Sequence, residues 1–269
     1  MVAYISNVNH PLASLTQADV PVFLDLIQVA AKSSKKVCLI LQSPGGDGDT
    51  AEKMLGLFRD TFNEDFRVII PQYAKSAATM IAVGADRIIM SDASELGPID
   101  PQVGVPLPSG QLQFVPAKAY VGAIDELKNK IMAEPESISA YYPILQQIKP
   151  EMIKFCEDTI ASAKDFAKRW LPKGAMEGKT QPEIDATTKE LIEGERYRLH
   201  GNVINHKEAH DNLKLDVEYW PMSDPRWLKL WEYYVRAISS FDQNGAKLFE
   251  STQTSTTMSI QIVPLPPHK

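Results

Sequence analysis

Residues 37–47 read VCLILQSPGGD and place a short, branched, apolar run directly before a glycine pair. A continuous apolar run of this kind is typical of a strand buried on both faces of a parallel sheet. Similar runs follow at 67–70 (RVII) and 87–90 (RIIM), and helical patterns at 50–62 and 74–84 separate the three runs. Strand, helix, strand, helix, strand with short connections predicts right-handed βαβ crossovers and therefore an α/β fold.

The flanking sequence predicts further helices and two extended segments. Residues 17–32 carry apolar side chains at three- and four-residue spacing, which predicts an amphipathic helix capped by Thr16. Residues 93–116 are rich in Pro and Gly and predict a long extended loop or hairpin. Four later stretches lack strand alternation and predict helices: 120–133, 144–170, 182–193 and 227–241.

These patterns divide the chain into three predicted parts. Residues 1–120 form the α/β core, and residues 121–255 form a helical portion that completes the domain and supplies oligomer contacts. Aromatic residues between Tyr219 and Tyr234 fit that role, because such a cluster at helical spacing is typical of a core or a subunit interface. Residues 256–269 are rich in Ser, Thr and Pro and predict a flexible tail.

Composition narrows the class of protein. The chain has 269 residues, 44% hydrophobic residues and a net charge of −6, which indicates an ordinary globular protein and argues against nucleic acid as a partner. Its apolar runs fall short of the ~20 residues of a membrane-spanning helix. We therefore expect a cytoplasmic protein without an integral membrane segment, with membrane association left open. Cys38 and Cys156 form no closely spaced pair, so neither a disulfide scaffold nor a cysteine-built zinc site is expected.

The first candidate site is the glycine pair Gly45 and Gly46, which lies where a buried strand ends and a helix begins. Ligands bind at this edge of an open α/β sheet. Glycines there allow positive φ and a close backbone approach, so their N–H groups can point at an anion or a developing oxyanion. The alternative is a tight turn that needs glycine for shape alone. Neither GxxxxGK[ST] nor GxGxxG is present, so the segment is not a phosphate loop.

The second candidate site is Ser76, which follows another buried strand at the predicted start of a helix. A serine in this place has its hydroxyl at the sheet edge, and its small neighbours leave room for a substrate backbone. The alternative is that Ser76 only caps the helix, since serine is a favoured cap.

Three motifs in this order resemble the superfamily of Clp protease and signal peptide peptidase A. They are SPGG at 43–46, SAATMIAVGADRI at 76–88 and SELGPIDPQ at 94–102. The last of these is similar to the serine dehydrogenase proteinase branch in particular. The resemblance implies a Clp/crotonase-like fold of stacked βαβ units with a helical C-terminal portion.

The resemblance also implies an activity and the residues that carry it. It implies peptide-bond hydrolysis with Ser76 as nucleophile and an oxyanion hole at Gly45, Gly46 and Ala77, the N–H groups of Gly46 and Ala77 being the donors. It implies a peptide or protein as substrate, a homo-oligomeric assembly, and neither cofactor nor metal.

The general base is harder to assign. Clp-type enzymes place a histidine in the loop after the third strand, but this sequence has Asp100 there, so the standard Ser-His-Asp triad cannot be carried over. The peptide peptidase branch uses a lysine several dozen residues beyond the serine, and Lys118 is the best placed lysine. The alternative is that Lys118 is a solvated lysine at the start of a helix. His200, before Gly201, is the other candidate, as a catalytic or supporting group.

Two other functions fit the same resemblance. One is acyl-CoA chemistry, in which two backbone N–H groups polarise a thioester, although the usual acidic catalytic residues are not evident. The other is a non-catalytic member that binds peptides or serves as a scaffold, a reading that the missing loop histidine favours.

Overall fold

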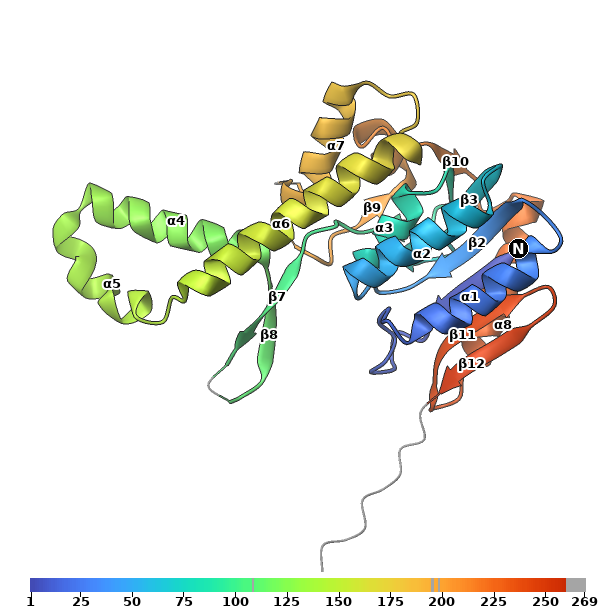
Figure 1. Ribbon diagram of the computed structural model, residues 1–269, viewed down its shortest axis with the longest axis horizontal. Helices are drawn as coiled ribbons and strands as arrows, with labels where there is room; N and C mark the ends of the chain where they lie inside the picture. The colour runs from blue at the N-terminus through green and yellow to red at the C-terminus, as the bar shows by residue number, and fades with distance from the viewer. Residues whose placement is uncertain (108, 195, 198, 260–269) are drawn as a thin grey trace, which may run out of the picture.

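The computed structural model describes residues 1–107, 109–194, 196–197 and 199–259 (Figure 1). Its main sheet has seven strands in the order β10-β5-β3-β2-β1-β11-β12. The strands from β10 to β1 are parallel to their neighbours, and β11 and β12 are antiparallel. Their bounds are β1 Val2–Ser6, β2 Lys36–Gln42, β3 Asp65–Ile69, β5 Arg87–Met90, β10 Val217–Tyr219, β11 Gly245–Ser251 and β12 Ser255–Ser259.

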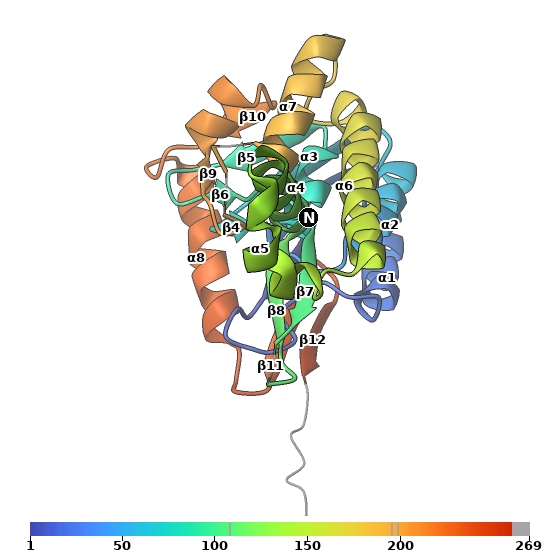
Figure 2. The same cartoon turned by 90° about the vertical axis from the view of Figure 1, so that its left-hand side faces the viewer.

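Helices cover both faces of this sheet (Figure 2). The main core lies under α1 Asp19–Ala31, α2 Gly48–Thr61, α3 Ala77–Val83, α6 Pro150–Trp170 and α7 Gln181–Glu193. A second core lies under α8 Pro225–Ser239. Successive side chains of a strand point to opposite faces, so Leu39 and Leu41 enter the main core while Ile40 enters the second. Burial on both faces explains why β2 is a continuous apolar run.

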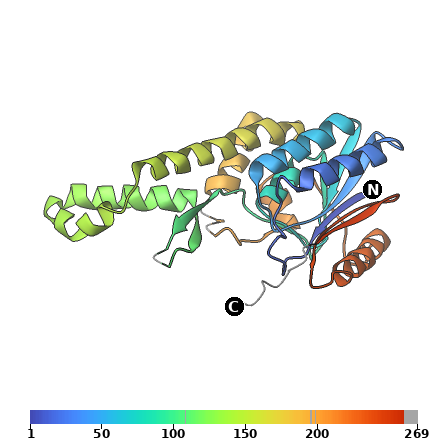
Figure 3. The same cartoon turned by 60° about the horizontal axis from the view of Figure 1, so that its bottom comes forward.

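Two smaller sheets and an arm complete the fold. A three-stranded sheet joins β4 Tyr73–Ala74, β6 Glu95–Leu96 and β9 Ile204–Asn205. The hairpin of β7 Gln102–Pro106 and β8 Leu112–Pro116 leads into α4 Ala117–Ala133, η1 Pro135–Ser137 and α5 Ile138–Leu145. With the start of α6, these elements project from the sheet as an arm (Figure 3). The remaining short elements are η2 Leu171–Lys173 and η3 Glu208–Asn212.

The α/β class and the strand, helix, strand order that follows residue 36 are confirmed. Several details of the prediction were wrong. Thr16 does not cap α1, which begins at Asp19 after Ala18 without a side-chain cap; instead the Thr16 N–H donates to the Asp19 carboxylate at 2.8 Å. The helix expected over 144–170 is broken: α5 ends at Leu145, and α6 begins at Pro150, which takes the first helical position, where its missing N–H is not needed.

The ends of the chain also differ from the prediction. Residues 2–6, which lie outside every strand predicted above, form β1 in the interior of the sheet, between β2 and β11. Residues 256–259 of the predicted tail lie in β12, and residues 260–269 lie outside the described residues. Residues 121–255 supply β9, β10 and β11 as well as helices. Among the described residues, no helix combines the length and apolar character needed to cross a membrane.

A buried ion pair ties the C-terminal strands to α1. The Lys247 ammonium lies 2.8 Å from both carboxylate oxygens of Asp19, and the two side chains are 1% and 0% exposed. Lys247→Met is expected to lower the free energy of unfolding by about 3–5 kcal/mol, because it leaves the Asp19 carboxylate buried without its partner. Urea unfolding measures this change. A loss no larger than that of Lys154→Met, which removes the exposed pair with Asp158, would contradict it.

Candidate active site

Ser76 has a strained backbone and an unusual place in the chain. It connects β4 to α3 with φ 50° and ψ −116°, and only one other non-glycine residue among those described, Lys214, has a positive φ. Such a conformation costs about 1–3 kcal/mol and persists only where its surroundings enforce it. The Ser76 side chain makes no capping hydrogen bond to α3. A role as a simple helix cap is therefore excluded.

The glycine loop lies directly against Ser76. The loop has φ +97° at Gly45 and +143° at Gly46, values that favour glycine. A Cβ on Gly45 would lie 2.9 Å from Ser76 Cβ and 2.5 Å from the Lys75 carbonyl oxygen. A parallel bridge between Ser43 and Ala74 holds the glycine loop at this distance from Ser76. The first glycine is thus required for close contact and not for turn shape alone.

The peptide between Gly45 and Gly46 turns its N–H away from the neighbouring segment at Leu15. The Gly45 carbonyl accepts the Leu15 N–H at 2.7 Å, and a trans peptide points its N–H opposite to its carbonyl. Neither the Gly46 nor the Ala77 N–H has an acceptor within the described part of the chain, whereas the Gly45 N–H donates to Ser43 Oγ at 3.2 Å.

The three-stranded sheet brings distant residues to the same edge. Strand β4 is parallel to β6, with Ala74 opposite Leu96, and β9 is antiparallel to β6, with Ile204 opposite Leu96. One end of this sheet therefore holds the residues that follow β4, those that follow β6 and those that precede β9. The polar residues that follow or precede these strands there include Ser76, Asp100 and His200, as well as Lys75 and Asn202.

Asp100 and His200 are in direct contact. His200 Nδ1 lies 2.8 Å from Asp100 Oδ1, and the other oxygen of Asp100 accepts the Gln102 Nε2–H at 2.8 Å. The Asp100 side chain is 1% exposed, while that of His200 is 34% exposed. The contact therefore combines a buried carboxylate with a ring that substrate can reach. Sequence reasoning named His200 but missed this partner, because the two residues are separated by 100 positions.

Lys75 joins the segments around the site. Its ammonium pairs with Glu95 at 2.9 Å and donates to the carbonyls of Leu96 and Asn202, each at 3.2 Å. Leu96 belongs to β6, and Asn202 follows His200 closely. The Lys75 side chain, from the residue before Ser76, thus links the β6 segment and the segment around His200.

Lys118 lies at the start of α4, and the hydrogen bonds of its ammonium go to residues other than Ser76. Its ammonium donates to the carbonyls of Gly194 and Tyr197, each at 3.4 Å. Both acceptors belong to the segment that leads to His200. None of the hydrogen bonds found for Lys118 involves Ser76, which the structure places after a different strand.

Two other kinds of chemistry, by a cysteine thiolate and by a bound metal, have no support in the described residues. Burial raises the pKa of the Cys38 thiol to about 12 and also raises that of Cys156, so neither is a ready thiolate nucleophile near neutral pH. Over the described ranges, no group of three or more His, Cys, Asp and Glu side chains is arranged to hold a metal.

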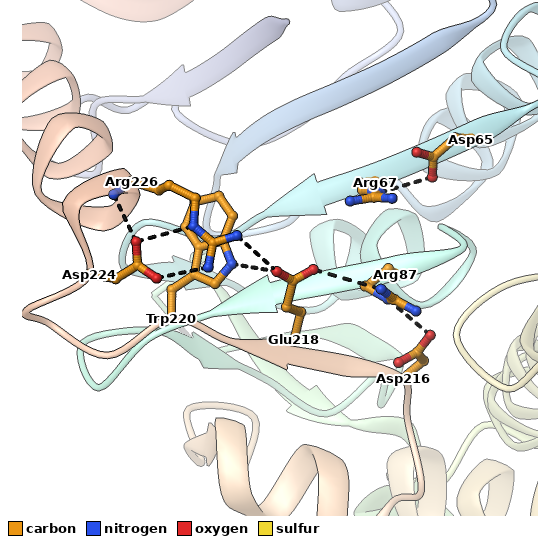
Figure 4. A network of polar contacts seen from close by, with 8 residues as sticks. All are labelled: Asp65, Arg67, Arg87, Asp216, Glu218, Trp220, Asp224 and Arg226. Carbon is orange, nitrogen blue, oxygen red and sulfur yellow. Dashed lines mark hydrogen bonds and ion pairs between the residues drawn. The ribbon is translucent and has the colours of Figure 1, made fainter.

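A charged cluster lies on the face of the sheet that α8 covers. Figure 4 shows it running from Asp65 and Arg67 through Arg87 and Glu218 to Arg226, which lies over the Trp220 ring. Arg67 and Arg87 lie on the same face of β3 and β5 as Ile69 and Ile89, which pack in the second core, and Arg226 lies at the start of α8. Among the described residues, none of the ion pairs of this cluster involves Ser76 or the glycine pair.

The fold and the site together define an α/β protein with a strained serine at its sheet edge, next to a glycine pair. The model of the ClpP-like SDH-type serine proteinase family matches residues 14–165, and the chain belongs to this family.

Two uncharacterised proteins of Methanocaldococcus jannaschii are similar over short segments. MJ0137 is 42% identical over 81 residues, which are 30% of this chain and 28% of that protein. MJ1495 is 41% identical over 66 residues, 24% of this chain and 22% of that protein. The matched segments thus span less than a third of either relative.

Two solved structures are similar at low identity. A mutant of the 1510-N membrane-bound stomatin-specific protease has a TM-score of 0.47 at 17% identity, covering 80% of this chain and 78% of that chain. ClpP1 from Listeria monocytogenes has a TM-score of 0.41 at 9% identity, covering 77% of this chain and 87% of that chain.

Proposed function

We propose that the chain is a serine peptidase that hydrolyses peptide bonds through Ser76, with a peptide or protein as substrate. The observation that carries the proposal is the strained Ser76 backbone next to two N–H groups without an acceptor among the described residues. Strain of this kind collects at functional sites, where it holds a reactive group in place. Membership of a serine proteinase family supports the same conclusion.

The proposed chemistry starts with attack of Ser76 Oγ on the carbonyl carbon of the scissile peptide. The developing oxyanion is held by the N–H groups of Gly46 and Ala77, each worth about 3–4 kcal/mol in the transition state. The C–N bond then breaks and the amine leaves with a proton, so the acyl group remains on Ser76 as an ester. Water hydrolyses this ester and restores the serine hydroxyl.

Substrate choice separates this proposal from its alternatives. We expect the protein to cleave an unfolded protein such as casein and to release new amino termini, because the chain belongs to a family of serine proteinases. Hydrolysis of an acyl-CoA thioester without casein cleavage would favour the acyl-transfer alternative. Binding of casein without cleavage by the folded protein would favour a scaffold.

We also propose that the chain assembles as a homo-oligomer through residues 121–255. In α5, the side chains of Ile138, Tyr142 and Ile144 are exposed and none of the residues is buried. Exposed apolar side chains grouped on one element mark an interaction surface. Light scattering should give a mass above that of one chain, and replacing Ile138 and Ile144 with Asp should lower it. A monomeric mass at micromolar concentration would contradict this assembly.

A further inference from the structure

We propose that the buried ion pair of Asp19 and Lys247 positions the glycine loop at Gly45 and Gly46 for catalysis, through the backbone next to Asp19. Both are positioning residues, because they act on the loop through other groups. The inference rests on the proposed function, since it explains what keeps the proposed oxyanion donor in place.

Backbone encloses the glycine loop on two sides. A Cβ on Gly45 would lie 2.5 Å from the Lys75 carbonyl oxygen, and a Cβ on Gly46 would lie 2.3 Å from the Leu15 carbonyl oxygen. Lys75 directly follows β4, whereas Leu15 belongs to the connection between β1 and α1, residues 7–18, which lies outside every helix and strand of the described chain. The loop therefore keeps its place only if this connection is held by other contacts.

Leu15 is bonded to the glycine loop at two points. Its N–H donates to the Gly45 carbonyl at 2.7 Å, and its carbonyl accepts the Asp47 N–H at 2.9 Å. The Gly45 carbonyl and the Gly46 N–H belong to one planar peptide. A shift of the Leu15 backbone therefore moves the Gly46 N–H as well.

The ion pair holds the residue that follows Leu15. The Thr16 N–H donates to Asp19 Oδ2 at 2.8 Å, and the Asp19 N–H donates back to the Thr16 carbonyl at 3.0 Å. The Lys247 ammonium lies 2.8 Å from both carboxylate oxygens of Asp19, so the acceptor itself is fixed. Hydrogen bonds to an ionised acceptor are stronger than those between neutral groups. The carboxylate thus holds the backbone of Thr16, and with it that of Leu15.

Strand β11 holds both ends of the connection. At its start, the Asn7 N–H donates to the Ala246 carbonyl at 2.8 Å, and the Asn7 side-chain amide donates to the Gly245 carbonyl at 2.9 Å. At its end, Lys247 holds the carboxylate of Asp19. Consecutive residues of a C-terminal strand therefore set the position of a loop that is some 200 residues earlier in the chain.

The test compares kcat and KM for peptide hydrolysis in the full chain of Lys247→Met and Thr16→Pro, as rates per folded molecule. Thr16→Pro keeps the ion pair and removes only the N–H that Asp19 accepts, so it tests the inference even if Lys247→Met folds poorly. We expect kcat to fall by about 10–100-fold in both, with KM within about threefold, because a misplaced donor is missed in the transition state.

Leu230→Ala is the matched control for lowered stability. Leu230 is buried in the second core under α8, so its truncation leaves a cavity on the other face of the sheet. The melting temperature should fall, but kcat per folded molecule should stay within about twofold of the wild type. A purely structural role of the ion pair predicts the same result for Lys247→Met.

Amide hydrogen exchange gives a readout that does not depend on activity. We expect faster exchange at residues 43–48 in Lys247→Met and Thr16→Pro, with residues 65–69 of β3 as protected as in the wild type, because only the loop loses its support. Leu230→Ala should leave residues 43–48 unchanged.

Each outcome decides for or against the inference. A fall in kcat of at least fivefold in the folded variants, with faster exchange at 43–48, supports it. A smaller fall in either folded variant, unchanged exchange at 43–48, or an equal fall in Leu230→Ala overturns it. Faster exchange at 43–48 in a chain whose wild type cleaves no peptide supports the positioning of the loop and contradicts the proposed function, which separates the two failures.

Discussion

Ser76→Ala is expected to lower kcat for peptide hydrolysis by about 10⁴-fold or more, because removing the nucleophile disables the whole catalytic unit. The melting temperature should hardly change, since the Ser76 side chain makes no capping hydrogen bond. Ser139→Ala, which alters an exposed serine on α5, is the matched control and should keep full activity. Steady-state hydrolysis of a fluorogenic peptide measures the difference. Retained turnover in Ser76→Ala would contradict the assignment.

A second substitution at the same position tests the backbone strain. Ser76→Gly should be as inactive as Ser76→Ala, yet more stable than it by about 1 kcal/mol or more, because glycine adopts a positive φ without the Cβ penalty. Urea unfolding of the two variants gives the comparison. Equal stability would show that the φ of 50° stores no strain.

Gly45→Ala is expected to lower kcat by about 100-fold or more, on the scale of losing one oxyanion donor. A methyl group there would lie 2.5 Å from the Lys75 carbonyl oxygen and 2.9 Å from Ser76 Cβ, so the loop has to move. The peptide between Gly45 and Gly46, whose N–H is the proposed donor, moves with it. Rates per folded molecule, with the folded fraction taken from thermal melting, measure the effect.

Gly178→Ala is the matched control for this variant. Gly178 has φ +77°, but a Cβ there meets no atom within 4 Å, so it carries the backbone penalty without the overlap. Its kcat should equal that of the wild type. Ala77→Pro removes the other donor at the first position of α3, where proline is accepted, and should cost a similar factor. Full activity in both Gly45→Ala and Ala77→Pro would exclude the backbone donors.

The strands around the glycine pair could be predicted because local sequence carries their signal. The run at 37–41 is buried on both faces, so its composition alone marks a strand. Strand β1 was missed although it has a neighbouring strand on each side, since a short run at the chain start shows no crossover pattern. The two-residue strands β4, β6 and β9 are too short to produce any period, yet they position the site.

Candidate residues could be predicted only where chain order reflects spatial order. Ser76, Gly45 and Gly46 each follow a strand of parallel βαβ units, so the fold itself brings them to one edge. The contact between Asp100 and His200 depends on an antiparallel strand that returns after the arm, and nothing local encodes it. Lys118 was predicted as a candidate base from its distance along the chain, whereas its hydrogen bonds depend on the packing of a later loop.

The most direct test of the central claim is covalent labelling of the folded chain with a fluorophosphonate probe, followed by peptide mapping in a mass spectrometer. The account predicts one adduct, on the peptide that contains Ser76, and its loss in Ser76→Ala. An unlabelled Ser76 in protein that cleaves casein, or an adduct on a different serine, would contradict it.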